Sequence, residues 1–460
     1  MRGISKPRRQ LTKLFQSRLV LQQGLAPISA TQQRKHISSS SDASPLGTAS
    51  VDIGSIRNDM LTRPARVHLD RMNATNSNLL TTALFDLLPG ECFAEPLTSW
   101  EEIFNRDTDI GRYKGPFVPS GHHLVYFPLR LPGSQLCSDG TDPYHSPHGT
   151  PFTRRMWAGG SIQGLRGMAF DDRSAVCLEH IVDVNIRGAP NAEKIFVEVL
   201  REYTTLEDFR NRVDAKSLTL RPHPDPTDTI AAFGEDLDDH DIKGITERRT
   251  LVFMRELTDE EKMKNLEKGQ RIVKALNKPE YSVTLTPTPS LLFQYSALTY
   301  NAHRIHLDRS YCREVEGHQD LLVHGPLSLT LMLCTLQSRL INEKGQYEFI
   351  DNVDYRHLAP LYVNQPMRIC VALQKPRVTK SKVKEDGSDK GQRTKAKSKR
   401  EELVDPEDSD GVPKVEIGKN KWDIWVENHD GGLCVKGTAE TVKRRTLSKW
   451  DELPPDQRRI

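Results

Sequence analysis

A dense group of polar and ionisable side chains lies between residues 301 and 308. Asn301, His303, Arg304, His306 and Asp308 fall in this short segment, and apolar residues flank it on both sides. Such side chains are poor core formers, so we expect a loop that presents a site. An imidazole with a pKa near ~6.5 can give or take a proton at neutral pH, so His306 is the candidate acid or base.

Two other interpretations of this segment remain open. His303, His306 and Asp308 could bind a metal ion, although the sequence shows no fourth ligand and no H-E-x-x-H motif. The residues could also be structural, with Asp308 as the N-cap of a helix over Arg309–Val315 and the histidines bonded to the backbone. We favour proton transfer, with no metal and no cofactor.

The segment His324-Gly325-Pro326 provides a second chemical feature, because it opens a long apolar helix. The first N–H groups of a helix have no intrahelical partner, and the helix dipole is positive there. Proline has no N–H, so Gly325 is the natural donor, and its missing side chain lets a ligand approach. A thioester carbonyl placed there would be polarised, and one such donor typically contributes ~3–4 kcal/mol to transition-state stabilisation.

The elements around these segments predict an α+β arrangement. We expect a strand at Ser290–Ala297, and a helix from Pro326 that is apolar nearly all round and therefore enclosed by other elements. Four strands should follow, the last two joined by a turn at residues 428–432: Tyr347–Asp354, Pro366–Leu373, Lys421–Asn428 and Leu433–Val442. One helix followed by an antiparallel sheet that wraps it is an α+β fold.

The N-terminal part of the chain should form a second globular unit. Its expected strands are Leu124–Leu129, Ala175–Ile186, Ile195–Tyr203 and Thr250–Arg255. Trp157-Ala158-Gly159-Gly160 is interpreted as a tight turn. The predicted organisation is a presequence at 1–45, a linker at 46–78, an N-terminal domain at 79–256, a connector at 257–283, a catalytic domain at 284–446 with a solvated insertion at 375–414, and a tail at 447–460.

Charge and composition narrow the location and the partners. The first 41 residues carry eight Lys or Arg and no Asp or Glu, as is typical of a mitochondrial presequence, so we expect a matrix protein. No run of apolar residues is long enough to span a membrane. Residues 375–400 carry eleven basic side chains but no aromatic ones, so we expect no nucleic-acid binding. None of the seven cysteines forms a C-x-x-C pair, which argues against a zinc ribbon.

Several segments resemble the MaoC-like hydratase and dehydratase family. They are YSALTYNAHRIHLD at residues 295–308, with Arg313–Gly317, Leu322–Leu327, Gly121–Pro128 and Pro151–Gly160. More narrowly, they resemble 3-hydroxyacyl-thioester dehydratases of type 2 and the related mesaconyl- and itaconyl-CoA hydratases. The resemblance implies a double hot-dog, in which each half is an antiparallel sheet wrapped around one helix. It also implies dehydration of (3R)-3-hydroxyacyl thioesters of acyl carrier protein or CoA to trans-2-enoyl thioesters in mitochondrial fatty-acid synthesis, by a monomer or homodimer.

The family motif D-x-N-P-x-H-x-D assigns roles to the central segment. Aligned on residues 306–308, it puts His306 at the catalytic histidine and Asn301 at the catalytic aspartate, with His303 at the motif asparagine. An amide cannot carry a proton through a reaction, so His306 should perform most of the transfer while Asn301 positions and His303 assists. Gly325 completes the catalytic group. The expected substrate-binding residues are Arg304, Tyr295, His324, Arg154 and Arg155.

Three rival functions follow from the same residues. A hydratase of a C4–C5 dicarboxylic CoA ester would need a cation for the free carboxylate, and Arg304 is a candidate. The amide at Asn301 leaves open a thioester-binding module without turnover. A metal-dependent hydrolase would instead use His303, His306 and Asp308.

Overall fold

The computed structural model describes residues 53–93, 97–99, 102, 117–189, 192–216, 244–267, 273–275, 277–340, 348–375 and 419–443. The presequence predicted at 1–45 and the tail at 447–460 lie outside the described residues, as does the insertion apart from Lys375. Among the helices that the structure describes, none is both long and apolar enough to cross a bilayer.

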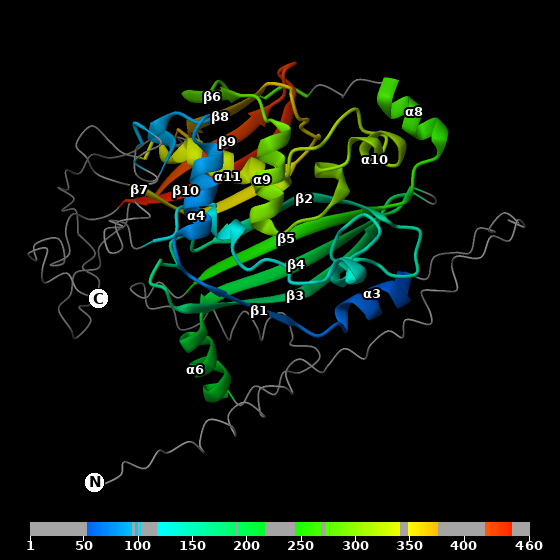
Figure 1. The fold of residues 1–460 in the computed structure, drawn as a ribbon, viewed down its shortest axis with the longest axis horizontal. Helices are drawn as coiled ribbons and strands as arrows, with labels where there is room; N and C mark the ends of the chain where they lie inside the picture. Colours follow the sequence, from blue (N-terminus) through cyan, green and yellow to red (C-terminus); the bar gives the residue numbers. More distant parts are fainter. Residues whose placement is uncertain are drawn as a thin grey trace, which may run out of the picture. The chain divides into compact units, whose positions relative to one another are not determined.

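In the part of the chain that the structure describes, ten antiparallel strands form one continuous sheet, in the order β1-β3-β4-β5-β2-β7-β10-β9-β8-β6 (Figure 1). The N-terminal half contains β1 Arg66–Arg71, β2 Arg154–Gln163, β3 Ser174–Arg187, β4 Lys194–Thr205 and β5 Ile245–Met254. The C-terminal half contains β6 Tyr281–Leu285, β7 Glu348–His357, β8 Met367–Leu373, β9 Lys419–Glu427 and β10 Leu433–Lys443. Both halves have the same order of first, third, fourth, fifth and second strand, which confirms the α+β double hot-dog.

The two halves meet where β2 pairs with β7. Gly159 lies opposite Arg356 and Gly160 opposite Tyr355, and β2 carries a bulge between Trp157 and Gly159. A Cβ atom on Gly159 would lie 2.4 Å from the carbonyl oxygen of Tyr355, so the close approach of the strands requires glycine. The predicted tight turn over residues 157–160 is therefore wrong, because these residues are part of a bulged strand at the centre of the sheet.

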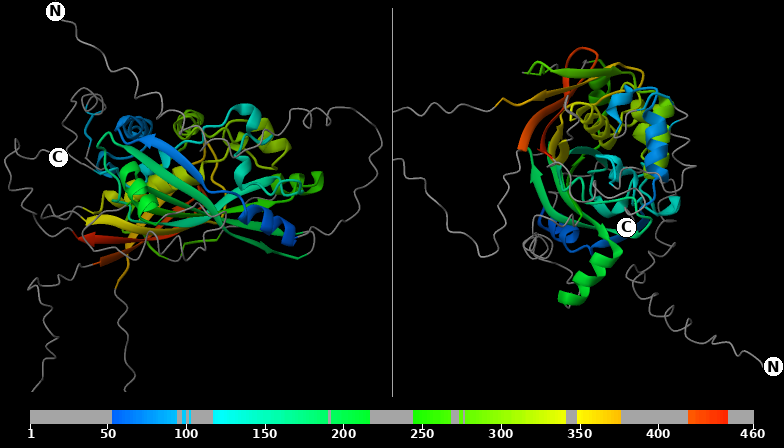
Figure 2. Two further views of the ribbon diagram at one scale, coloured as in Figure 1. Left: turned by 90° about the horizontal axis from the view of Figure 1, so that it is seen from below. Right: turned by 90° about the vertical axis from the view of Figure 1, so that its left-hand side faces the viewer.

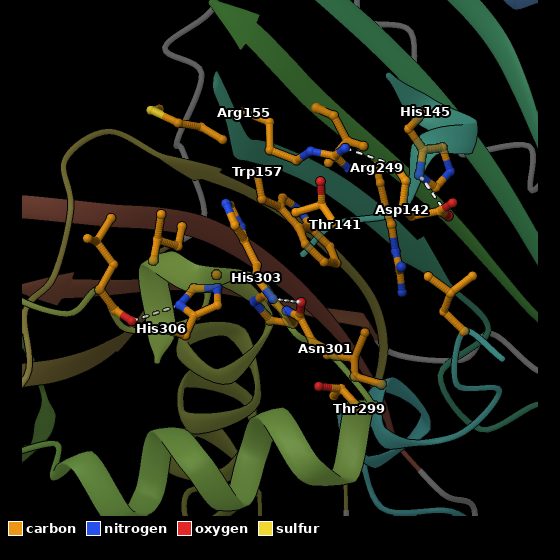
Figure 3. Close-up of a pocket in the computed structure, with 18 of the residues that line it drawn as sticks. Thr141, Asp142, His145, Arg155, Trp157, Arg249, Thr299, Asn301, His303 and His306 are labelled. Atoms are coloured by element: carbon orange, nitrogen blue, oxygen red, sulfur yellow. Dashed lines mark hydrogen bonds and ion pairs between the residues drawn. The ribbon is translucent and has the colours of Figure 1, made fainter. Parts of the chain in front are cut away.

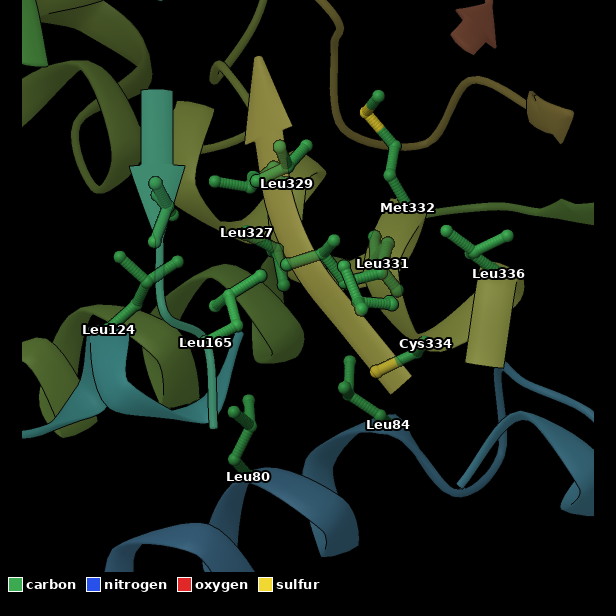
Figure 4. Close-up of a cluster of buried hydrophobic side chains, with 14 of the residues drawn as sticks. Leu80, Leu84, Leu124, Leu165, Leu327, Leu329, Leu331, Met332, Cys334 and Leu336 are labelled. Atoms are coloured by element: carbon green, nitrogen blue, oxygen red, sulfur yellow. The ribbon is translucent and has the colours of Figure 1, made fainter. Parts of the chain in front are cut away.

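Helix α11, Gly325–Gln337, forms the centre of the C-terminal half. Every residue from Leu327 to Leu336 is buried, as its nearly uniform apolar sequence predicted. The helix packs against β7, β8 and β9, and its leucines meet Leu80 and Leu84 of α4, Thr75–Leu84 (Figure 4). The hydroxyl of Thr335 donates to the carbonyl of Leu331 one turn earlier, so a buried polar side chain is satisfied inside the helix.

The N-terminal half is built differently. Helix α4 packs chiefly on α9, Pro289–Thr299, and on the 3-10 turn η4, His122–Val125, rather than on the sheet. The helices α4, α9 and α11 lie on the concave side of the curved sheet (Figure 2). Among the described residues, the expected helix enclosed by a sheet is thus found in the C-terminal half, and the concave face of β1, β3, β4 and β5 has no such helix.

The remaining elements are short. The helices are α3 Ile53–Leu61, α6 Leu206–Lys216, α8 Asp259–Glu267 and α10 Arg309–Glu314, and the 3-10 turns are η3 Gly90–Cys92, η5 Gly133–Gln135, η6 Pro143–His145 and η7 Arg304–His306. Strand β1 lies within the predicted linker 46–78, and β6 begins within the predicted connector 257–283. Both are edge strands of five or six residues, which give weak signals in sequence.

Two predicted strands are not strands. Residues 290–297 belong to helix α9, which begins where the side chain of Thr288 accepts a hydrogen bond from the N–H of Leu291 and Pro289 occupies the first turn. A short apolar run fits a buried strand or a buried helix equally well, and here the Thr-Pro start was the informative signal. Residues 124–129 form the end of η4 and the irregular segment that follows it. The turn η4 begins after Gly121, whose backbone is in the left-handed conformation.

Candidate active site

A pocket of about 320 Å³ lies between the loop 299–306, the start of α11 and the concave face of the N-terminal half (Figure 3). Residues from both halves line it, including His306, Asn301, His303 and Gly325. The four residues predicted to be catalytic therefore face one cavity. Its wall on the N-terminal side includes Arg249, which was not predicted.

His306 is held in one tautomer. Its Nδ1 atom lies 2.8 Å from the carbonyl oxygen of Leu322, and because a carbonyl only accepts, Nδ1 carries the proton. The Nε2 atom is then left with a lone pair. Burial lowers the pKa of His306 to about 4, so the ring is neutral at pH 7 and available as a base.

His324 supports this ring from behind. The two imidazoles stack with centroids 3.6 Å apart, and the Nε2 atom of His324 lies 2.8 Å from the hydroxyl of Ser296. Tyr295 packs against His324 at 5.1 Å between ring centroids. Tyr295 and His324 are fully buried and do not line the pocket. The structure thus places these two predicted substrate-binding residues behind His306.

Asn301 and His303 form the adjoining wall. The amide oxygen of Asn301 accepts a hydrogen bond from the backbone N–H of His303 at 3.1 Å, which leaves the amide NH₂ as a donor for a ligand. The His303 ring stands edge-on to His306 at 5.6 Å, and its Nε2 atom is 3.5 Å from a carboxylate oxygen of Asp139. Burial holds the pKa of His303 well below its usual value.

Gly325 is the first residue of α11, after His324 at the N-cap. A Cβ atom at this position would lie 3.3 Å from Cε1 of His357 and 3.4 Å from Cβ of Trp157, so the backbone here is closely walled. Gly325 lines the pocket at the helix start, where the first N–H groups have no intrahelical partner, so its role as a carbonyl-binding donor stays a prediction.

His357 is a pocket residue that the sequence did not reveal. Its Nε2 atom is buried and has no hydrogen-bond partner among the described residues, and burial lowers its pKa to about 4. The predicted strand ended at Asp354, whereas β7 continues to His357. The alternation of Val353 and Tyr355, both buried, would have placed His357 on the inner face if the strand had been extended.

The predicted arginines are engaged elsewhere. Arg154 lines the pocket, but its Nε donates to Glu316 at 2.7 Å. Arg155 donates to the carbonyl of Asp142 at 2.9 Å and to the hydroxyl of Ser146 at 2.6 Å. Both are held by the protein itself, which weakens the expectation that they bind phosphate.

Arg304 does not line the pocket. It is half-exposed and pairs with Asp308 at 2.7 Å, so the structure does not bring it to His306. The other carboxylate oxygen of Asp308 accepts from the N–H of Tyr311 at 3.0 Å, which confirms Asp308 as the cap of α10. Because both oxygens are engaged outside the pocket, the metal interpretation loses its third ligand.

Comparisons with known proteins identify a family. The family model described as hydroxyacyl-thioester dehydratase type 2 matches residues 121–363, which is more than half of the chain. A mitochondrial hydroxyacyl-thioester dehydratase type 2 of Schizosaccharomyces pombe is 29% identical over 260 residues, covering 55% of this chain and 77% of that protein. The mesaconyl-C(4)-CoA hydratase of Chloroflexus aurantiacus is 29% identical over 264 residues, covering 55% of this chain and 74% of that protein.

Among solved structures, a MaoC-like dehydratase from Phytophthora capsici aligns with 85% of this chain and 99% of its own, with a TM-score of 0.45 and 10% identity.

Proposed function

The chain belongs to the hydroxyacyl-thioester dehydratase type 2 family, and from this premise we propose that it interconverts (3R)-3-hydroxyacyl and trans-2-enoyl thioesters. The observation that carries the proposal is the pocket shared by His306, with its free Nε2 lone pair, and Gly325 at the start of α11. A base and a carbonyl-binding donor are the two groups that elimination next to a thioester requires.

In the dehydration direction, the thioester carbonyl accepts a hydrogen bond from the N–H of Gly325. The Nε2 atom of His306 removes the proton from Cα, and the negative charge that develops on the carbonyl oxygen is stabilised by the helix start. The proton on His306 then passes to the hydroxyl group on Cβ, the C–O bond breaks, and water leaves as the double bond forms. Hydration is the same sequence in reverse.

Two neighbouring side chains assist in this proposal. The amide NH₂ of Asn301 donates to the hydroxyl oxygen and holds it beside His306, which an amide can do without titrating. The unpartnered Nε2 of His357 lies next to Gly325, so with a proton on Nε2 it would give the carbonyl oxygen a second donor. His303 orients the loop through its backbone N–H and packs against His306.

The setting is also a proposal. The name of the Schizosaccharomyces pombe relative supports a mitochondrial protein, and we propose the matrix, with acyl carrier protein or CoA as carrier in fatty-acid synthesis. The relative named as a mesaconyl-C(4)-CoA hydratase supports the alternative of a short dicarboxylic ester. Both settings use the same catalytic groups and differ in what the far end of the acyl group must contact.

The reaction is tested with purified protein and crotonyl-CoA, by following the loss of enoyl-thioester absorbance. We expect hydration by the unmodified protein and its loss in His306→Ala. A failure to turn over any enoyl or 3-hydroxyacyl thioester would reject the enzyme and leave a thioester-binding module.

A further inference from the structure

A row of alternating charges crosses the concave face of the N-terminal half, and the reaction described above does not use it. Arg66 of β1 is the register partner of Glu179 on β3, which is the partner of Arg201 on β4, which is the partner of Glu247 on β5. These four residues are here called the charge ladder. Arg66, Glu179 and Arg201 line the same pocket as His306.

The C-terminal half shows how the equivalent face of its own sheet is packed. There the equivalent surface is apolar and packs on α11, with Val353, Ile369 and Ile424 in the core. Among the described residues, this face does not enclose a helix in the way that the other half encloses α11; the 3-10 turn η6 covers part of the ladder instead, with Asp142 paired to Arg66 and His145 3.4 Å from Glu179. Burying charges without packing is costly, so a charged wall along a cavity points to a polar occupant.

Each carboxylate oxygen of the acidic ladder members already has a donor of the protein beside it. One oxygen of Glu179 accepts from Arg66 and the other lies 3.2 Å from Nε of Arg201. One oxygen of Glu247 accepts from Nε of Arg249 at 2.6 Å, and the other accepts from the hydroxyl of Tyr203 at 2.5 Å. The carboxylates are thus fully engaged with the protein.

Donors, in contrast, are in excess. Each guanidinium carries five N–H groups, and Arg66, Arg201 and Arg249 all line the pocket. The hydrogen bonds of Arg249 to Glu247 and Tyr203 use its Nε and one terminal nitrogen, which leaves the N–H groups of the second terminal nitrogen as donors. Such a wall best accepts a ligand that brings oxygen atoms with lone pairs.

The middle members of the ladder are buried in the wall of the pocket. Glu179 is 4% exposed and Arg201 is 7% exposed, and Arg249 lies across the cavity from His303 and His306 (Figure 3). A carrier with phosphate groups is too large for a cavity of about 320 Å³ and must remain at its mouth. With the thioester at Gly325, the part of the substrate that can reach the ladder is the far end of the acyl group.

We propose that the charge ladder binds the far end of the acyl group and selects short acyl groups that end in a hydrogen-bond-accepting oxygen, such as a carboxylate, over groups that end in a methyl. An aliphatic end would displace water from the arginine N–H groups without replacing its hydrogen bonds, whereas an oxygen-bearing end replaces them. This inference rests on the proposed reaction and names its substrate class: of the two settings proposed above, it favours the short dicarboxylic ester over the methyl-ended acyl groups of fatty-acid synthesis.

A metal ion is a weaker occupant for this wall. Asp142, His145 and Glu179 have ligand atoms within 4.8 Å of one another. However, Arg66 already pairs with Asp142 at 2.5 Å and with Glu179, and Arg201 pairs with Glu179 as well. Two guanidinium groups at the same carboxylates repel a further cation.

The test compares two enoyl thioesters of equal length. Hex-2-enoyl-CoA ends in a methyl, and the mono-CoA ester of hex-2-enedioic acid, joined so that its free carboxylate is at the far end, supplies the oxygens. We expect kcat/KM for hydration to be about 100-fold higher for the carboxylate-ended ester in the unmodified protein. Equal or faster turnover of the methyl-ended ester would overturn the inference.

Arg66→Met then assigns the preference to the ladder, since Arg66 is its least buried end. We expect the ratio of the two kcat/KM values to fall at least tenfold, and an unchanged ratio would overturn the assignment. Arg71→Met is the matched control, because Arg71 is on the same strand but exposed and paired with Asp172. Crotonyl-CoA separates the two proposals: its hydration without any preference among the longer esters leaves the reaction standing and rejects the ladder, whereas no hydration of any ester rejects the reaction itself.

Discussion

The imidazole of His306 lies flat against that of His324, with ring planes inclined by only 21°. The hydrogen bond from His306 to the Leu322 carbonyl fixes one edge of the ring, and His324 fixes one face. Ser296 of α9 in turn holds His324 by a hydrogen bond, so α9 is linked to the imidazole of His306 through His324.

Replacing His306 by glutamine should abolish most of the activity, because glutamine fills a similar space but cannot take up the proton that the proposed reaction removes from Cα. We expect kcat to fall about 10³-fold, within the range for a general acid–base residue. Steady-state hydration of crotonyl-CoA measures it. The exposed His429 of the β9–β10 turn gives the control, and a comparable loss in His429→Gln would point to a folding defect instead.

His324 is a positioning residue, and its substitution should change the titration of its neighbour. In His324→Leu the stacking and the Ser296 bond are both lost, while the volume is roughly kept. We expect kcat to fall about tenfold with little change in KM, and the acidic limb of the kcat profile to shift. An unchanged profile with reduced protein stability would indicate a purely structural role.

The pH dependence of activity should reflect the buried base. Because burial lowers the pKa of His306 to about 4, the ring stays neutral, with a free lone pair on Nε2, down to that pH. The acidic limb of kcat/KM should therefore lie well below the ordinary histidine value of ~6.5. Initial rates of hydration between pH 4.5 and 8 in buffers of constant ionic strength check this, and a midpoint near 6.5 would contradict it.

Stability should fall steeply with acid. Burial lowers the pKa of His123, His306 and His357 to about 4 each, whereas in the unfolded chain they bind protons near ~6.5. Between these values the unfolded state holds more protons, so this stability is present above pH ~6.5 and is lost as the pH falls toward 4. Each group contributes a slope of about 1.4 kcal/mol per pH unit.

Urea denaturation at pH 7.5, 6 and 5 measures that slope. His357→Leu removes one buried titrating group, so its slope should be about 1.4 kcal/mol per pH unit smaller than that of the unmodified protein. Identical slopes in His357→Leu and in the unmodified protein would refute this account.

Gly325→Ala should impair catalysis without harming the helix. Alanine is the better helix former, but its Cβ would meet His357 and Trp157 at 3.3–3.4 Å beside the N–H that binds the carbonyl. We expect kcat/KM to fall tenfold or more with the melting temperature within a few degrees. Gly133→Ala is the matched control, since no atom lies within 4 Å of the added methyl group, and full activity in Gly325→Ala would remove the glycine from the mechanism.

Local patterns in the sequence predicted what depends on neighbours along the chain. The burial of α11 followed from its many leucines, and the cap at Asp308 from its position before a short predicted helix. The dense group at 301–308 predicted a loop site, and His306, His303 and Asn301 do line one pocket.

What the sequence concealed depends on register between distant strands. Arg66, Glu179, Arg201 and Glu247 are spread over some 180 positions, and only strand pairing aligns them. His357 was hidden in the same way, because its role follows from where β7 runs beside α11. Arg304 shows the opposite error. Its position close to His306 in the sequence suggested that it would bind substrate, but in the structure it pairs with Asp308 outside the pocket.

The glycine pair at the β2–β7 seam has a mechanical consequence. Since hydrogen bonds between strands continue from one half of the molecule into the other, no hinge separates them, and the walls of the pocket cannot part like the lobes of a clamshell. Thioester and water would then enter past the loops that line the pocket, while the two halves of the sheet keep their relative positions. A methyl group added at Gly159 would clash with the backbone of β7 and disrupt the strand pairing that joins the two halves.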